Sequence, residues 1–184
     1  MDAKTLCLGA LCLRDASGYE IKKLFEDGDF SHFCEPSFGS IYPALNRLVE
    51  DGLASFTAMP QDKRPDKKVY SITAKGRDAF CEALKAPPAS DKYRSDFCFM
   101  MVFGHLLPRD RLAQLMDIQN AYYKGMIARM ESCEDLDEAP PPARFVHELG
   151  LAIFRAAADY IDQNKDSLLD ETTAAAADAT RAAE

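Results

Sequence analysis

The sequence predicts a mainly α-helical protein in which one β-hairpin interrupts the helices of the first half. Apolar residues recur at helical spacing through most of the 184 residues. Two strand-like runs, 53–59 and 68–72, flank a polar loop, which is typical of a hairpin with a long tip. The Pro-containing run 86–90 cannot continue a helix, and we place a domain boundary there.

This boundary divides the chain into three predicted parts. Residues 1–86 hold four helical patterns and the hairpin, whereas residues 91–170 are helical throughout. Residues 171–184 are rich in alanine and contain no large apolar side chain, so we expect a flexible tail of frayed helix or disorder.

The composition is that of a folded protein with a buried core. The chain is 47% hydrophobic and 28% charged, and no apolar run reaches the roughly 18 to 20 residues that a membrane-spanning helix needs. The apolar segment at residues 1–15 has no signal-peptide cleavage pattern, and we interpret it as a helix of the mature protein. The 6 cysteines lie singly, without metal-ligand spacing, which favours a reducing cytoplasm and predicts neither a metal nor a cofactor.

The first part has clear helix boundaries. Ser17 and Glu20 form a predicted capping box that opens the second helix, and Gly52 ends the third. Thr73 caps a fourth helix behind the hairpin. In the whole chain we expect helices near residues 4–13, 17–28, 37–52, 74–85, 95–106, 108–130 and 143–169.

The order helix, helix, helix and two-stranded hairpin is that of a winged helix-turn-helix domain. Within it lie the runs Gly18-Tyr19-Glu20-Ile21, Gly39-Ser40-Ile41-Tyr42-Pro43-Ala44-Leu45, Glu50-Asp51-Gly52-Leu53 and Lys68-Val69-Tyr70-Ser71-Ile72-Thr73. Together with Lys75-Gly76-Arg77, they resemble the PadR family over residues 6 to about 80. The chain departs from the family pattern at Ser17, where a histidine is common, and at Val49, where an acidic residue is common.

The resemblance implies a homodimeric DNA-binding transcriptional regulator, most often a repressor, with a C-terminal helical dimerisation domain. It also suggests release from DNA by a small hydrophobic or aromatic effector. We therefore expect three partners: double-stranded DNA with a near-palindromic operator, a second copy of the chain and a small hydrophobic ligand. No membrane partner is expected.

The third helix is the predicted recognition helix. If Ile41 is at the centre of its buried face, Asn46 and Arg47 point outward, where they can contact adenine and guanine or a phosphate. Pro43 fits only if the helix begins near Ser40. A solvated surface is the alternative for this face, whose predicted DNA contacts are Ser37, Gly39, Ser40, Tyr42, Pro43, Asn46 and Arg47.

Cations gather at the tip of the hairpin. Such side chains can contact phosphates or the minor groove beside a recognition helix. Asp62 and Asp66 dilute this charge, and a solvated loop is the alternative. The predicted contacts are Lys63, Arg64, Lys67 and Lys68, with Lys22 of the second helix as a further phosphate contact or an ordinary surface residue.

The run 96–103 is apolar almost all round, so its helix must be buried on several sides, which implies a partner surface. The predicted dimer interface consists of Phe97, Met101, Phe145, Leu149, Ile153, Ala156 and Tyr160. Other large side chains line either an effector pocket or the core: Phe99, Phe103, Tyr122, Tyr123 and Met126.

Two other functions fit the sequence less well. An enzyme is not expected, because His32, His105 and His147 lie in different elements without a catalytic partner at motif spacing. A winged-helix adaptor that binds a protein remains an alternative, since residues 1–86 carry a net charge of only −1 while residues 87–184 carry −7.

Overall fold

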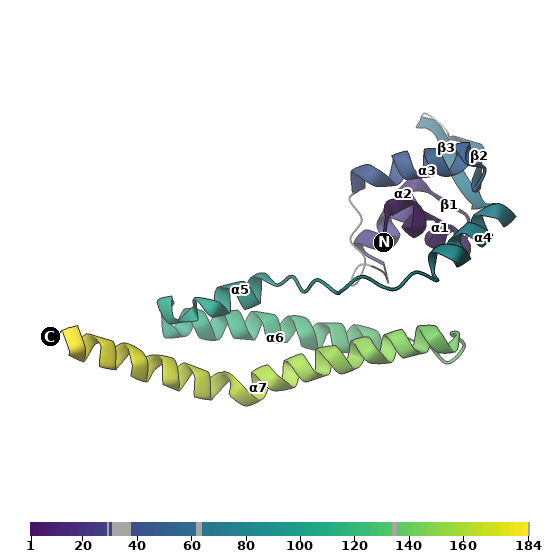
Figure 1. Cartoon of the computed structure of the whole chain (residues 1–184). Coiled ribbons are helices and arrows are strands. Elements are labelled where there is room, and N and C mark those ends of the chain that lie inside the picture. The colour runs from purple at the N-terminus through teal and green to yellow at the C-terminus, as the bar shows by residue number, and fades with distance from the viewer. Residues whose placement is uncertain (29, 31–37, 62–63, 134–135, 184) are drawn as a thin grey trace. The chain divides into compact units, whose positions relative to one another are not determined.

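The computed structural model describes residues 1–28, 30, 38–61, 64–133 and 136–183 (Figure 1). The chain forms two compact units, Met1–Asp91 and Lys92–Glu184. The predicted boundary at residues 86–90 lies next to the division between them. The predicted contacts Ser37 and Lys63 and the side chain of Arg64 lie outside the described part of the chain.

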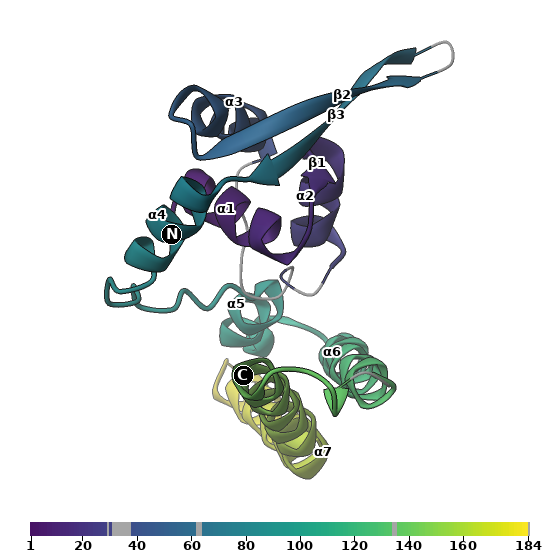
Figure 2. The same ribbon diagram turned by 90° about the vertical axis from the view of Figure 1, so that its right-hand side faces the viewer.

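The described residues of the first unit form α-helices and a small antiparallel sheet (Figure 2). The helices are α1 (Ala3–Leu13), α2 (Gly18–Glu26), α3 (Ile41–Glu50) and α4 (Ala74–Ala83), with the 3-10 turn η1 (Phe38–Ser40) before α3. The strands are β1 (Ala16–Ser17), β2 (Ala54–Gln61) and β3 (Arg64–Ile72), in the order β1-β3-β2. This is the predicted mainly α fold, in which β2 and β3 form the wing.

The expectation of a two-stranded hairpin was incomplete, because β1 adds a third strand. Ala16 and Ser17 pair with Tyr70 and Val69 of β3. In the sequence, Ala16 falls between the helices expected at residues 4–13 and 17–28. Two residues are too few to show the alternating pattern by which a strand is recognised in a sequence.

The core of the first unit lies between α1, α2 and α3. Leu11 of α1, Ile21 of α2 and Ile41, Leu45 and Leu48 of α3 are almost completely buried. The predicted buried face of the third helix is therefore confirmed. By exclusion, the opposite face of α3 points away from the core.

Backbone geometry ends α3 at the predicted glycine. Gly52 has a φ of 70°, which non-glycine residues rarely adopt. The Leu53 amide donates to the Leu48 carbonyl at 2.8 Å, and the Gly52 amide donates to the Val49 carbonyl at 3.0 Å. This Schellman motif turns the chain directly into β2.

Gly76 allows α4 to pack against the start of the wing. Its amide donates to Thr73 Oγ1, which caps the helix, and Thr73 Oγ1 also lies 3.1 Å from the Leu53 carbonyl. A Cβ atom on residue 76 would lie 2.0 Å from that carbonyl oxygen. Only a residue without a side chain fits there unless the backbone moves.

We therefore expect Gly76→Ala to destabilise the first unit by about 1–3 kcal/mol, the usual cost of overpacking. Denaturant unfolding followed by circular dichroism measures the change. Gly125→Ala is the matched control, because a Cβ on Gly125 meets nothing within 4 Å and alanine favours a helix. Equal stability of the two variants would contradict the packing argument.

The second unit is a pair of long helices with a short helix beside them. Its elements are α5 (Asp96–Val102), the 3-10 turn η2 (Gly104–Leu106), α6 (Arg109–Glu131) and α7 (Pro141–Ala183). Two expected boundaries were wrong. The helix expected at residues 95–106 divides at Phe103, and the last helix does not end near Leu169, since its alanine-rich continuation favours helical backbone.

The helix α6 packs along α7, and α7 continues beyond the start of α6 (Figure 1). Met116 and Tyr123 of α6 meet Ala158 and Ile161 of α7 in a small core. Ion pairs connect the two helices beside this core: Glu131–Arg155, Lys124–Asp162, Asp117–Lys165 and Arg109–Asp170.

Candidate nucleic-acid interface

The exposed face of α3 carries the side chains that were expected, from the sequence, to contact bases. Ser40 occupies the N-cap position, so Pro43 falls in the first turn. Its missing N–H leaves no hydrogen bond unmade there, because amides of the first turn have no partner within the helix. Asn46 and Arg47 are exposed one turn further on.

Tyr42 leaves this face toward the start of α2. Its ring packs on Gly18, where a Cβ atom would lie 2.5 Å from the ring. Tyr42 as a whole remains about half exposed, and a tyrosine side chain can hydrogen-bond to a DNA phosphate. Gly18 was found in the sequence only as part of a motif. Its role is to let Tyr42 pass close to the backbone.

The capping box at the start of α2 is confirmed and carries a further contact. The Glu20 carboxylate accepts from the Ser17 amide at 2.8 Å and from the Ser17 hydroxyl at 2.7 Å. The same carboxylate accepts from Lys67 Nζ of the wing at 3.0 Å. These hydrogen bonds, with those from Ser17 the largest, lower the pKa of Glu20 to about 2.

The two described lysine side chains of the wing, Lys67 and Lys68, both contact other residues of the chain. In the β2–β3 ladder Ala58 is opposite Lys68 and Met59 is opposite Lys67. Lys67 pairs with Glu20, and Lys68 Nζ lies 4.6 Å from the centre of the Phe56 ring. Sequence reasoning missed both partners, because a lysine pattern carries no signal of what lies opposite in space.

Lys22 on α2 has a local partner. Its Nζ lies 3.2 Å from the Glu26 carboxylate, one turn along the helix. Such an exposed pair contributes little stability and can be exchanged for another anion. The geometry is compatible with both roles that the sequence left open for Lys22.

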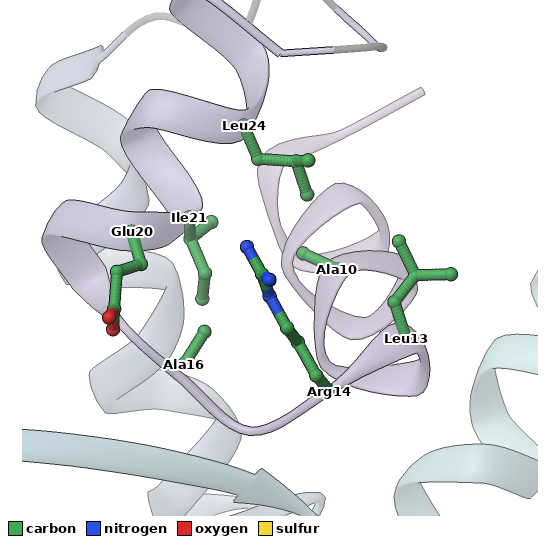
Figure 3. Close-up of a pocket in the computed structure, with 7 residues that line it drawn as sticks. All are labelled: Ala10, Leu13, Arg14, Ala16, Glu20, Ile21 and Leu24. Atoms are coloured by element: carbon green, nitrogen blue, oxygen red, sulfur yellow. The ribbon is translucent and has the colours of Figure 1, made fainter. Parts of the chain in front are cut away.

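A small cavity of about 230 Å³ lies between α1 and α2 (Figure 3). The Arg14 side chain extends into the space between the two helices, whereas the Glu20 carboxylate is turned away from its guanidinium. Glu20 therefore directs its charge to Ser17 and Lys67 rather than into the cavity. The cavity is lined by Ala10, Leu13, Arg14, Ala16, Glu20, Ile21 and Leu24.

The predicted interface residues of the second unit fall into two groups. Phe97 and Met101 of α5 are partly buried against the core of their own unit. Along α7 the predicted side chains are exposed and recur at helical spacing: Phe145, Leu149, Ile153, Ala156 and Tyr160. Large exposed apolar side chains on α5 and η2 extend this set: Phe99, Met100, Val102, Phe103 and Leu106.

The predicted effector residues divide between α5 with its C-terminal end and α6. The ring of Phe99 on α5 lies next to that of Phe103 at the C-cap of the helix, with centroids 5.3 Å apart and the ring planes tilted by 60°. Tyr123 and Met126 are buried side chains of α6, as the core alternative predicts. An open hollow in this unit includes Tyr122, and its lining consists of Arg94, Ser95, Asp96, Phe97, Gln119 and Tyr122.

No helix in the described part of the chain is both long and apolar enough to cross a membrane. Within the same residues, no three His, Cys, Asp or Glu side chains are grouped so that they could hold a metal ion. Burial raises the pKa of the Cys7 thiol to about 12.

Comparison with known proteins identifies relatives of this architecture. Residues 7–82 match the model of the Transcriptional regulator PadR-like family. The chain is 27% identical over 136 residues to the negative transcriptional regulator PadR of Bacillus subtilis, covering 67% of this chain and 74% of that protein.

Solved structures agree with this assignment along most of the chain. The PadR-like transcriptional regulator of Bacillus cereus superposes with a TM-score of 0.74 at 29% identity, covering 94% of this chain and 96% of that one. Bacillus subtilis PadR in complex with operator DNA gives a TM-score of 0.69 at 22% identity, with 92% and 98% covered. The exposed face of α3, the wing and the paired helices α6 and α7 thus belong to a fold shared with PadR-like transcriptional regulators, and residues 7–82 belong to the PadR-like family.

Proposed function

We propose that the protein is a sequence-specific DNA-binding regulator in which α3 enters the major groove. The observation that carries this proposal is the exposed face of α3, where Asn46 and Arg47 project from a helix whose other face is fixed in the core. Asn can pair with adenine through two hydrogen bonds, and Arg can do so with guanine. The accessible Tyr42 and the wing lysines supply phosphate contacts on either side.

We propose that it acts as a homodimer through the exposed apolar side chains of α5 and α7. A monomer in water would leave Phe145, Leu149 and Ile153 in contact with solvent. A twofold dimer presents two α3 helices to half-sites about 34–36 Å apart, or a multiple of that distance. The operator is then near-palindromic.

The direction of regulation that we propose is repression in the cytoplasm. The support is the Bacillus subtilis relative, which is named a negative transcriptional regulator. A structure of Bacillus subtilis PadR contains p-coumaric acid. Release of the present protein from DNA by a small hydrophobic or aromatic effector stays a prediction from sequence, which a titration of aromatic acids against operator binding would test.

A gel-shift experiment at about 50 mM salt, where phosphate contacts are strongest, tests the proposed function. The purified protein should shift a duplex from upstream of its own gene at concentrations that leave an unrelated duplex of equal length free. Specific binding is typically at least 10³-fold tighter than non-specific binding. Absence of any shift would overturn the proposal and favour the adaptor alternative.

A further inference from the structure

The Glu20–Lys67 ion pair connects the start of α2 to the wing, although the two residues are 47 positions apart. The pair is accessible, with 44% of the Glu20 side chain and 36% of the Lys67 side chain exposed. A phosphate of bound DNA can therefore reach Lys67 without any change in the core. Because the proposed function places DNA phosphates against the wing, the pair then lies on the DNA-facing surface.

The two partners are not equally free to move. Glu20 is held by the amide and hydroxyl of Ser17, and Ser17 is buried. Lys67 has a long flexible side chain whose cation is a point charge with three donors. When DNA approaches, Lys67 can leave the pair, whereas Glu20 stays at the end of α2.

The carboxylate also occupies the position that suits a phosphate. It lies at a helix N-terminus, takes the Ser17 amide and hydroxyl, and binds a wing cation. Amides at a helix N-terminus together with a nearby cation are what a DNA phosphate would use. Glu20 is thus an internal substitute for the phosphate.

We propose that Glu20 competes with DNA phosphates for Lys67 and thereby lowers the affinity of the protein for every DNA sequence alike. This inference rests on the proposed function. Transfer of Lys67 from Glu20 to a phosphate leaves a fixed negative charge unpaired beside the DNA, so the contact adds little net affinity. Discrimination then depends more on the base contacts of α3, since phosphate contacts carry no sequence information.

Glu20→Gln is the decisive variant because glutamine is also accepted at this position of a capping box. It removes the charge and keeps a hydrogen-bond acceptor for Ser17. We expect about three- to fivefold tighter binding to operator and to unrelated DNA, the equivalent of one exposed ion pair. The slope of log affinity against log salt should steepen by about 0.9 for each additional phosphate that the protein neutralises.

Glu82→Gln is the matched control. It removes the same charge and frees a lysine from an exposed ion pair, since Glu82 of α4 pairs with Lys85 just after the helix. Its effect measures the general consequence of a less negative protein. Lys67→Gln provides the second control. When Glu20→Gln is added to the Lys67→Gln variant, DNA affinity should rise by no more than it does when Glu82→Gln is made in the wild type.

Unchanged or weaker binding of Glu20→Gln to both duplexes would overturn the inference, as would a gain in affinity that persists without Lys67. The salt concentration that elutes each variant from a heparin column gives an independent measure of polyanion binding, and Glu20→Gln should elute later than the wild type. Failure of the wild type to prefer its operator would instead count against the proposed function.

Discussion

Replacing Asn46 and Arg47 together with alanine is expected to abolish the preference for the operator while binding to unrelated DNA persists. Both side chains are exposed on α3, and the residues that hold the helix in place, Ile41, Leu45 and Leu48, are unchanged. A bidentate contact discriminates against a wrong base by about 1–3 kcal/mol. Loss of two such contacts lowers the ratio of specific to non-specific affinity by about 100-fold or more.

Fluorescence anisotropy with operator and unrelated duplexes, each at several salt concentrations, measures this ratio. Glu50→Gln is the control on α3, because Glu50 is exposed at the C-terminal end of the helix, away from the proposed base contacts. The salt slope of the double variant should fall by no more than about one unit, as expected for loss of one phosphate contact by Arg47. An equal loss of affinity for both duplexes would contradict base reading by α3.

Leu149→Lys combined with Ile153→Lys is expected to convert the dimer into monomers and to lower operator affinity by more than about 100-fold. These side chains are 49% and 57% exposed, so their replacement leaves the α6–α7 core intact. In a dimer they would become buried, and an unpaired buried charge costs about 3–5 kcal/mol. A monomer presents only one recognition helix at a time.

Sedimentation velocity reports the oligomeric state, and the same anisotropy assay reports operator affinity. Glu148→Lys is the charge-matched control, since one such change alters the net charge as much as the two lysines do, at an exposed position on another side of α7. It should remain dimeric. A double variant that stays dimeric would place the interface elsewhere.

Local patterns predicted the extent and the buried face of α3 well. The spacing of Ile41, Leu45 and Leu48 defined its buried face, and the left-handed Gly52 defined its end, because both signals lie within one helix. The same holds for the capping box of Ser17 and Glu20.

Contacts between distant segments could not be predicted in this way. The sequence showed Lys67 as part of a charged loop and Gly18 as part of a motif. It did not show that Lys67 contacts Glu20 or that Gly18 contacts Tyr42. Phe97 and Met101 were assigned to the dimer interface by their apolar character alone. Which apolar residues of α5 pack within the chain depends on how α6 and α7 lie beside it.

The ion pairs between α6 and α7 affect the register of the two helices more than the small stability of each pair suggests. Along α6 the charges alternate as Glu131, Lys124, Asp117 and Arg109, and the first three are seven residues apart. Their partners along α7 alternate in the opposite sense: Arg155, Asp162, Lys165 and Asp170.

A shift of one helix by seven residues would preserve an apolar seam, since seven residues are nearly two turns. It would also bring Lys124 to Arg155 and Asp117 to Asp162, and a shift in the other direction would bring Glu131 to Asp162. Each native pair is exposed and contributes at most about 1 kcal/mol. The alternation nevertheless brings like charges together in both shifted alignments. The order of the charges therefore selects a single register between α6 and α7.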